Sequence, residues 1–347
     1  MEFGALLMFR NPPPWRRPMQ DVYHDLLDLA VFSENLGFDH LWTSEHHFLD
    51  DGWSPSQLPI LSAIAARTER IRLGTFVLLL PFHNSIRVAE DAATVDILSN
   101  GRFDLAVGPG SDPTDYRTFG IPMKQRRSRM HEGLQIIRRC FNEEEFSFLG
   151  KYWEFDNVRL TPKPVQKPLP LWVAALGPHA VEEAGANGYH LAAAPPAALQ
   201  QIYDTALRKA GHDPQQFQRA GLHVSHVAET HDKAWDESEA HIHWHMQVHY
   251  SRIMAAPENA GMARALAPDG NLTVPPVGEL RKTGRGPYGP AYVGSPDEVI
   301  AMLEDELKVC PMTQMIFIID PPGMDPRHIR NSMTLLAKEV IPHFRNR

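Results

Sequence analysis

Short apolar runs alternate along this chain with longer segments in which apolar residues recur at helical spacing. Residues 3–8 form the first apolar run and predict a strand, whereas residues 19–36 place Val22, Leu26 and Leu29 near one face of a predicted helix. Gly37 follows at a position where helices commonly end. The same pattern predicts strands over 3–8, 40–43, 71–80, 103–107, 171–174, 190–193, 222–228 and 314–319, and helices over 19–36, 58–67, 86–98, 124–141, 179–186, 196–210, 232–254 and 326–344.

Each of the eight predicted strands precedes a predicted helix, which is typical of parallel βαβ units. Eight such units favour a closed (β/α)8 TIM barrel, an α/β fold, over an open doubly wound sheet. The first strand is not followed by the G-x-G-x-x-G pattern of the open-sheet alternative. We therefore expect residues 1–347 to form a single barrel domain.

Two segments interrupt the alternation of strands and helices. Alternating aromatic residues over 146–160 predict a β-hairpin excursion from the barrel. Residues 255–292 are rich in Pro and Gly and show little periodicity. A loop of that length inside a compact domain is usually a functional lid, so we expect a long mobile loop over the active site.

Composition excludes several classes of protein. The formal net charge of −8 over 347 residues argues against a nucleic-acid binder, which would present a basic face. The two cysteines, Cys140 and Cys310, provide no disulfide framework. No apolar run approaches the ~18 residues of a membrane span, and no signal peptide is evident. We expect a cytoplasmic protein with no membrane or nucleic-acid partner.

In a TIM barrel the active site lies at the carboxyl ends of the strands. The second predicted strand is followed there by Glu45, His46 and His47. A histidine beside a glutamate at a strand end can transfer protons near neutral pH, although a histidine held by loop hydrogen bonds explains the pattern equally well. A metal site is less favoured, because adjacent side chains on an extended segment point to opposite sides.

Weaker signals lie elsewhere in the chain. The turns 108–110 and 176–179 precede predicted helices, whose first N–H groups attract anions, but Gly and Pro mark turns everywhere. His241, His245 and His249 form one stripe on a predicted helix. We place this helix in the outer ring, away from the strand ends, and favour a polar surface or subunit contact over a metal site. Candidates for an apolar pocket, if they are not core residues, are Phe9, Trp42, Phe48, Trp53 and Phe82.

Several segments carry a resemblance to a known family. The stretch 37–48, GFDHLWTSEHHF, resembles the luciferase-like monooxygenases at their second strand, and 72–110 resembles their third and fourth strands. Further similarity lies at YRTFG (116–120), at the turn after the fifth strand, at VGSPDEVI (293–300) and at Val340-Ile341-Pro342. The resemblance covers nearly the whole chain and implies an FMN-dependent monooxygenase. It also implies a homo-oligomer, a dimer.

The resemblance assigns roles to individual positions. It implies that reduced FMN arrives from a separate NAD(P)H:flavin reductase and that O2 oxidises a small organic substrate. His46 is implied to act as a base and stabiliser near the flavin, and Glu45 to help position the flavin site. A non-proline cis peptide is expected between Phe76 and Val77. The residues implied to contact FMN are Thr75, Phe76, Val77, Gly108, Ala174, Leu176, Gly177, Pro178 and His179; no metal is expected.

Two departures from the family pattern concern the flavin phosphate. Many members carry an arginine after the fourth-strand glycine, where this chain has Pro109. The turn after the fifth strand is commonly rich in Gly and Ser, and here it is Leu176-Gly177-Pro178-His179. His179 is a candidate for the replacement contact. Two alternative functions stay open: hydride transfer with a deazaflavin coenzyme, and a non-catalytic flavin-binding barrel.

Overall fold

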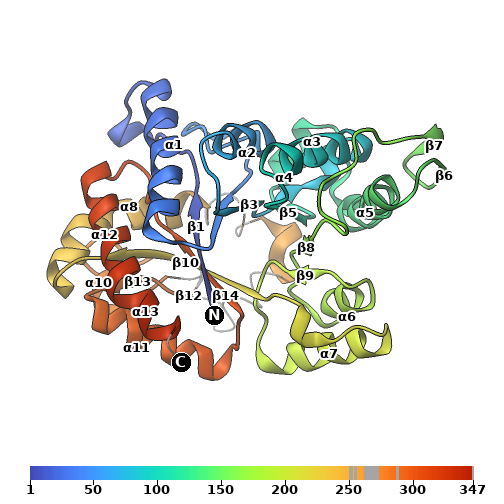
Figure 1. Ribbon diagram of the computed structural model, residues 1–347. Helices are drawn as coiled ribbons and strands as arrows, with labels where there is room; N and C mark the ends of the chain where they lie inside the picture. Colours follow the sequence, from blue (N-terminus) through green and yellow to red (C-terminus); the bar gives the residue numbers. More distant parts are fainter. Residues whose placement is uncertain (250–252, 254–255, 262–272, 287–288, 346–347) are drawn as a thin grey trace.

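The computed structural model describes residues 1–249, 253, 256–261, 273–286 and 289–345. Parallel strands run through the centre of the molecule, and helices pack around them (Figure 1). The strands are β1 (Glu2–Leu7), β2 (His40–Thr43), β3 (Arg72–Thr75), β4 (Leu78–Leu79), β5 (Phe103–Gly108), β8 (Leu171–Val173), β9 (His190–Leu191), β10 (Ala220–Val227), β13 (Tyr292–Gly294) and β14 (Gln314–Ile318).

The strand order is β13-β10-β14-β1-β2-β3-β5-β8-β9, and β4 pairs with β5. All of these pairings are parallel. A further parallel bridge joins Leu191 of β9 to Arg219, the residue before β10. The pairings therefore run around in the order expected of a TIM barrel. We call the curved sheet made by these strands, apart from β13, the barrel sheet.

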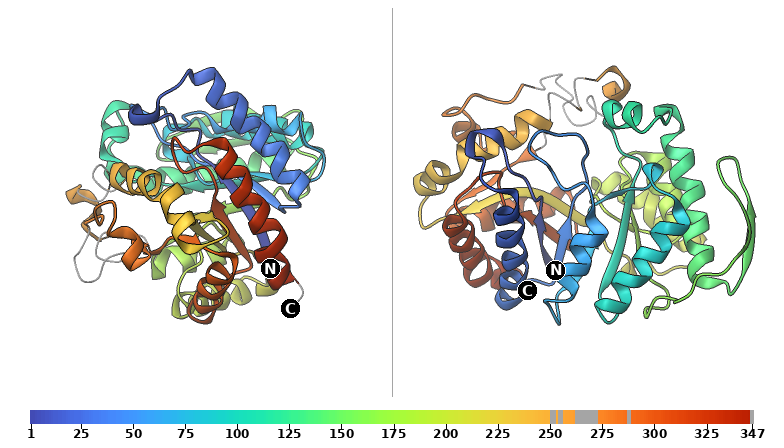
Figure 2. Two further views of the ribbon diagram at one scale, coloured as in Figure 1. Left: turned by 90° about the vertical axis from the view of Figure 1, so that its left-hand side faces the viewer. Right: turned by 90° about the horizontal axis from the view of Figure 1, so that it is seen from above.

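The helices cover the outside of the barrel sheet, as the views in Figure 2 show. Helix α1 buries Val22, Leu26 and Leu29, and it ends at Gly37, which adopts a left-handed φ of 83°. The main helices are α1 (Met19–Leu36), α2 (Gln57–Ala65), α3 (Ser85–Leu98), α4 (Pro113–Thr118), α5 (Arg126–Asn142), α6 (Pro178–Ala186), α7 (Ala197–Lys209), α8 (His231–His249), α11 (Pro296–Val309), α12 (Pro326–Leu335) and α13 (Ile341–Arg345).

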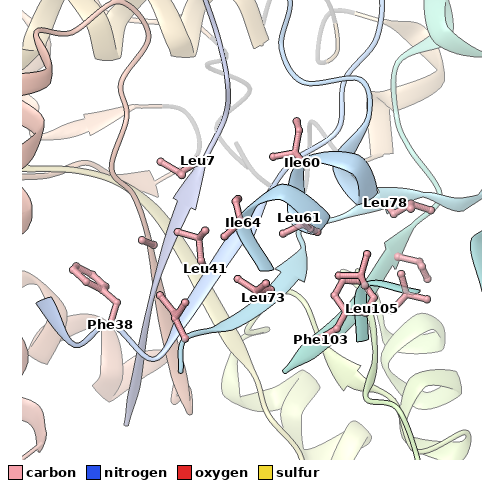
Figure 3. Packing of buried hydrophobic residues seen from close by; sticks show 14 of the residues in the cluster. Leu7, Phe38, Leu41, Ile60, Leu61, Ile64, Leu73, Leu78, Phe103 and Leu105 are labelled. Atoms are coloured by element: carbon pink, nitrogen blue, oxygen red, sulfur yellow. The ribbon is translucent and has the colours of Figure 1, made fainter. Parts of the chain in front are cut away.

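Successive residues of a strand face opposite sides of the sheet, so the barrel sheet has two apolar faces. On the outer face, Leu41, Leu73 and Leu105 pack with Leu61 and Ile64 of α2 (Figure 3). On the inner face, a second group of buried residues includes Leu6, Met8, Trp42, Phe76, Ala106, Trp172, Val224, Ile316 and Ile318, together with Ile242 and Met246 of α8. We call this second group the inner cluster.

Two tryptophans fill the amino end of the inner cluster. The Trp42 and Trp172 rings lie 5.4 Å apart, edge to face. The glycine at position 74 makes room for Trp42, because a Cβ there would lie 2.2 Å from its ring. Near the start of β5, Asp104 accepts hydrogen bonds from Trp172 Nε1 at 3.1 Å and from Arg72 Nε at 2.8 Å. Large rings and paired charges thus occupy this end of the sheet and leave the carboxyl end for a cavity.

The structure also corrects several predicted elements. The run 71–80 is not one strand, because Phe76 and Val77 separate β3 from β4. Helix α11 and strand β13 were not predicted. No correction is needed at 146–160, where the expected β-hairpin corresponds to the antiparallel pair β6 (Phe146–Leu149) and β7 (Glu154–Val158). The C-terminal helix is interrupted by a π-helical turn, η7 (Leu336–Val340).

The expected lid over 255–292 falls partly outside the described residues. Its described part holds the short elements α10 (Leu280–Thr283), β11 (Arg285–Gly286) and β12 (Gly289–Pro290). None of the helices that the structure describes is both long and apolar enough to cross a membrane.

Candidate active site

A cavity of about 290 Å³ lies at the carboxyl end of the barrel sheet. Its residues come from β1, β10, β12 and β14, from the segments after β2 and β3, and from α8, and most of them are apolar. They are Leu6, Met8, Ser44, His46, Trp53, Phe76, Leu222, His223, Val224, His245, Met246, Gly289, Pro290 and Ile318. A mainly apolar cavity with a few polar groups at this end of the strands is the expected place for a ligand.

His46 lies in this cavity, directly after β2. Its ring centroid is 4.0 Å from that of Trp53, with the two planes tilted by 48°. Trp53 is fixed in turn, because its Nε1 donates a hydrogen bond to Ser44 Oγ at 2.7 Å. The His46 backbone N–H donates to the carbonyl of Ser54 at 3.3 Å. The loop after β2 thus folds back on itself and holds the His46 imidazole at the cavity wall.

Glu45 is not among the residues that line the cavity, and its side chain is 1 % exposed. Its carboxylate accepts hydrogen bonds from Nε2 of His47 and Nε2 of His83, both at 2.8 Å. Gln57 Nε2 and the backbone N–H of Leu79 also donate to it, both at 3.2 Å. These contacts tie the loop after β2 to α2, to β4 and to the segment that precedes α3.

The four donors decide the charge of Glu45. Burial by itself raises the pKa of a carboxyl group, but the hydrogen bonds from His47 and His83 and the charge of these rings outweigh it and lower the pKa of Glu45 to about 2. In His83, burial lowers the pKa, but the hydrogen bond to Glu45 and the negative charges of Glu45 and Asp91 together outweigh it and raise the pKa. Glu45 is therefore an anion with all its nearby donors engaged, which suits holding a loop better than exchanging protons.

The pairing of Glu45 corrects one expectation. The sequence predicts an acid–base role for His46 beside Glu45, whereas in the structure the Glu45 carboxylate is hydrogen bonded to His47. The side chains of adjacent residues on extended backbone point to opposite sides, so a group that holds His47 is directed away from His46. The His47 ring packs against Phe119, with centroids 4.9 Å apart, and against Phe82 at 5.9 Å.

The resemblance implies that the residues at the end of β3 contact the flavin. The Phe76–Val77 peptide bond is cis, as expected, and Phe76 lines the cavity. Thr75, however, uses its hydroxyl inside the sheet, donating to the Ala106 carbonyl at 2.7 Å and accepting from the Ala106 N–H at 3.0 Å. A Cβ at Gly108 would lie 2.5 Å from Val77 Cγ2 and 3.6 Å from the side chain of Ala174. Val77, Gly108 and Ala174 are therefore close neighbours.

The predicted phosphate segment forms the start of α6. Gly177 is the residue before the helix, and it offers no side-chain cap to the first N–H groups. Pro178 occupies the first helical turn. Leu176 and His179 are exposed, with Leu176 at 54 %. Uncapped N–H groups at a helix start are a suitable anion-binding feature.

Helix α8 corrects a second expectation. The helix was assigned to the outer ring, away from the strand ends, but His245 lines the cavity beside Met246. Helix α8 buries Trp235, Ile242 and Met246 in the inner cluster, which explains its position at the cavity. His241 makes a 2.9 Å hydrogen bond with the Pro322 carbonyl, and the side chain of His249 lies outside the described residues. In the part of the chain that the structure describes, no three His, Cys, Asp or Glu side chains are grouped to hold a metal.

Three charged residues that sequence analysis did not select lie near the cavity. Arg10 forms a buried ion pair with Asp51, and their side chains are 0 % and 2 % exposed. Asp320 accepts a hydrogen bond from the Met8 N–H at 2.8 Å, and burial raises the pKa of Asp320 to about 7. Arg10 follows β1 and Asp320 follows β14, so their position after apolar strands was the signal available in the sequence.

Only one of the proposed pocket aromatics lines the cavity, and it is Trp53. Trp42 is buried in the inner cluster and Phe9 in the outer core. Phe48 and Phe82 belong to a separate group of rings around Phe119. Of the three buried candidates, Phe9 and Trp42 are thus core residues and Trp53 lines the cavity.

Comparisons with known proteins agree with this geometry. The model of the luciferase-like monooxygenase family matches residues 1–309. The oxygenase component of a flavin-dependent trigonelline monooxygenase from Acinetobacter baylyi is 28 % identical over 52 % of this chain and 51 % of its own length. An F420-dependent glucose-6-phosphate dehydrogenase from Amycolatopsis mediterranei is 35 % identical over 47 % of this chain and 51 % of its own length.

A solved structure is similar over the whole chain. A monooxygenase from Streptomyces bottropensis superposes with a TM-score of 0.81 and 25 % identity, covering 99 % of this chain and 100 % of that one. By contrast, the matched segments of the trigonelline oxygenase and the F420-dependent dehydrogenase span about half of those proteins.

Proposed function

The chain belongs to the luciferase-like monooxygenase family, and on that premise we propose that it is the oxygenase of an FMN-dependent monooxygenase. It takes reduced FMN from a separate NAD(P)H:flavin reductase and uses O2 to oxidise a small organic substrate. Support for the separate reductase comes from the trigonelline enzyme, which is named as the oxygenase component. We also propose that residues 1–347 act as one barrel domain and assemble as a homodimer.

The observation that carries this proposal is the position of His46. It lies on the wall of a mainly apolar cavity at the carboxyl ends of the strands, and its neighbour Trp53 is itself fixed by a hydrogen bond to Ser44. An imidazole held in that way can accept or donate a proton at a substrate near neutral pH. We assign this role to His46, and we assign to Glu45 the role of positioning the loop that carries it.

Of the residues expected to contact the flavin, Phe76 lines the cavity and offers an aromatic surface. Val77, Gly108 and Ala174 lie beside one another outside the cavity lining and would extend the contact region for a flat ring system. The exposed start of α6, from Leu176 to His179, would hold the phosphate with its uncapped N–H groups in place of the arginine that Pro109 replaces. Thr75 would support the site through Ala106 rather than touch the cofactor. When bound, reduced FMN supplies the electrons that activate O2.

A second candidate function rests on the F420-dependent relative, which is 35 % identical over about half of each chain. In this alternative the same cavity holds a deazaflavin and transfers a hydride without O2. A non-catalytic flavin-binding barrel is the third reading. The apolar cavity with a fixed His46 is compatible with hydride transfer as well as with oxygenation.

The deciding experiment measures O2 uptake by the purified protein with an added flavin reductase, NADH and a panel of small substrates. We expect uptake coupled to product formation with FMN and no turnover with reduced F420. Turnover with F420 in the absence of O2 would replace the first proposal by the second. Flavin binding without either activity would favour the non-catalytic reading.

A further inference from the structure

A second cavity, of about 310 Å³, is lined by residues of α1 and α12, which pack side by side on the outside of the barrel (Figure 2). It shares no lining residue with the cavity that holds His46. The segments after β1 and β14 complete its wall, and its apolar part includes Val22, Leu26 and Leu29 of α1 and Ile329 of α12. The proposed oxygenase uses the first cavity, so this second one has no role in that reaction.

The charged groups at the exposed part of the second cavity already have partners. Arg17 Nη1 donates a hydrogen bond to Asp25 Oδ2 at 2.5 Å, and the two side chains are 39 % and 38 % exposed. Asp325 accepts a hydrogen bond from the backbone N–H of Arg327 at 2.8 Å, and its carboxylate also pairs with the Arg327 guanidinium at 2.6 Å. An arginine therefore neutralises each of these carboxylates near the surface.

Two buried polar residues of the wall are engaged as well. Arg10 Nε donates to Asp51 Oδ2 at 2.6 Å, which makes a neutral ion pair. Asn11 donates from Nδ2 to the Arg17 carbonyl at 2.6 Å and accepts at Oδ1 from the Arg17 N–H at 3.1 Å. These side chains hold the segment after β1 in place, and they add no net charge to the cavity.

Asp320 is the carboxylate of the wall that lacks such a partner. It is 5 % exposed, and its Oδ2 accepts a hydrogen bond from the Met8 N–H at 2.8 Å. Its Oδ1 has no hydrogen-bond partner among the residues that the structure describes. Burial raises the pKa of this carboxyl group to about 7, although backbone donors and the charge of Arg10 act to lower it. A donor that also carries positive charge would stabilise the ionised form most.

A ligand with an ammonium group can supply that donor. An ammonium group brings three N–H donors and one positive charge, and the apolar side chains of α1 and α12 can contact an apolar body attached to it. A carboxylate ligand would be repelled by ionised Asp320, and an alcohol would donate without neutralising the charge. A metal ion is less suited, because the described part of the chain groups no three His, Cys, Asp or Glu side chains for one.

We propose that this cavity is a second ligand site, which binds a small primary amine with an apolar body through an ion pair between the ammonium group and the Asp320 carboxylate. The site adjoins the first cavity, because Arg10 lines it and also contacts His245 and Trp53 of that cavity. The amine is a ligand distinct from the substrate of the proposed reaction, and its binding involves neither flavin nor O2.

The test is a binding comparison on the whole purified chain at about pH 8, without flavin or O2. The probes are cyclohexylamine, cyclohexanol and cyclohexanecarboxylate, which share a ring and differ in the charge of the polar group. Affinities are measured by calorimetric titration. We expect the amine to bind about tenfold more tightly than the alcohol, as for a charge-assisted hydrogen bond, and the carboxylate to bind most weakly.

Two carboxylate variants locate the bound amine. Asp320→Asn keeps an oxygen for the Met8 N–H but removes the charge, so it should abolish the preference for the amine over the alcohol. Asp325→Asn is the matched control, because it removes a charge from the same wall that Arg327 already neutralises, and asparagine caps a helix equally well. It should keep the preference. A preference that survives in folded Asp320→Asn, or a wild-type protein that shows none, overturns the proposal.

The pH profile of the wild-type protein is a second measurement and needs no variant. Only ionised Asp320 pairs with the ammonium group, so the affinity for cyclohexylamine should rise by roughly tenfold per pH unit between about pH 5 and 7 and then level off. The affinity for cyclohexanol should change much less. An amine affinity that does not vary with pH over this range would contradict the ion pair.

The other groups around the cavity should not produce this profile. Hydrogen bonds from Arg327 lower the pKa of Asp325 to about 2, and Asp25 is paired with Arg17. The ring of His241 packs on the tryptophan of the wall, and burial lowers its pKa, so it gains no charge as pH rises. A rise in amine affinity between pH 5 and 7 would therefore report the ionisation of Asp320.

Discussion

Two buried carboxylates at the carboxyl ends of the strands have opposite protonation behaviour. Glu45, after β2, has a pKa lowered to about 2, whereas Asp320, after β14, has a pKa raised to about 7. Burial opposes ionisation in both. Glu45 overcomes it because two imidazoles, an amide and a backbone N–H donate to it. Asp320 receives backbone donors only, including the Met8 N–H, and its other oxygen has no hydrogen-bond partner among the described residues.

The contrast shows that the kind of hydrogen-bond donor, more than the depth of burial, determines the charge of these two carboxylates. Donors that can themselves carry charge hold Glu45 as an anion in the loop that carries His46. Neutral donors leave Asp320 close to neutral after β14, near the Arg10–Asp51 pair. The predictions below test this difference, starting with the largest expected effect.

Replacing Glu45 by Ala should have the largest effect on stability. The change leaves the N–H groups of His47, His83 and Leu79 without their acceptor in a buried site, and breaking such a network typically costs ~3–5 kcal/mol. The free energy of unfolding from urea titration measures it. Glu45→Gln keeps one accepting oxygen and should lose less. If both variants are as stable as the wild type, the four hydrogen bonds are not the anchor of this loop.

The two carboxylates should also give pH dependences of opposite sign. The lowered pKa of Glu45 stabilises the fold above pH ~4.5, and this contribution, about 3 kcal/mol for 2.5 pH units, is lost as pH falls toward 2. The raised pKa of Asp320 means that the folded state binds the extra proton, so stability falls as pH rises from about 4 to 7.

Urea titrations of two variants across pH 3 to 8 separate these effects. Glu45→Gln should lose the acid-side slope and keep the decline toward pH 7. Asp320→Asn should lose that decline and keep the acid-side slope. Parallel pH profiles for the two variants would show that the carboxylates do not differ as described.

His46→Ala tests whether the histidine on the cavity wall is needed for turnover. We expect the proposed oxygenation to fall by roughly 10²-fold or more, as for loss of a general acid or base, because His46 lines the cavity. Stability should fall only modestly, since His46 is half-buried. The measurement is kcat from O2 uptake with reduced FMN.

The matched control is His47→Ala, at the adjacent position. His47 holds Glu45 and does not line the cavity, so the variant should lose roughly 1–3 kcal/mol of stability while the folded protein keeps most of its activity. A folded His47→Ala protein that turns over more slowly than His46→Ala would move the catalytic role to His47.

The smallest expected effect is that of Asp320→Asn at pH 5. At that pH Asp320 is already protonated, and asparagine keeps an oxygen to accept from the Met8 N–H. The free energy of unfolding should change by less than ~1 kcal/mol, as for a near-isosteric replacement. A loss as large as that of Glu45→Ala would mean that Asp320 is held as an anion.

The sequence by itself determined the order of eight strands and their following helices, missing β13 and α11, and the strand end that carries His46. Both are local properties: apolar periodicity distinguishes strands from helices, and the EHHF segment follows its strand directly. The resemblance added the cis peptide between Phe76 and Val77. Sequence also indicated the alternation of Glu45, His46 and His47 on opposite sides of extended backbone.

Only the tertiary structure decided the partners of those residues. Glu45 is joined to His83, 38 positions away, and Arg10 to His245, 235 positions away. Helix α8 lies at the cavity because Ile242 and Met246 pack into the inner cluster, and an apolar stripe on a helix does not indicate which apolar surface it will cover. Periodicity is fixed by neighbours along the chain, whereas the charge of a buried side chain depends on donors brought together by packing.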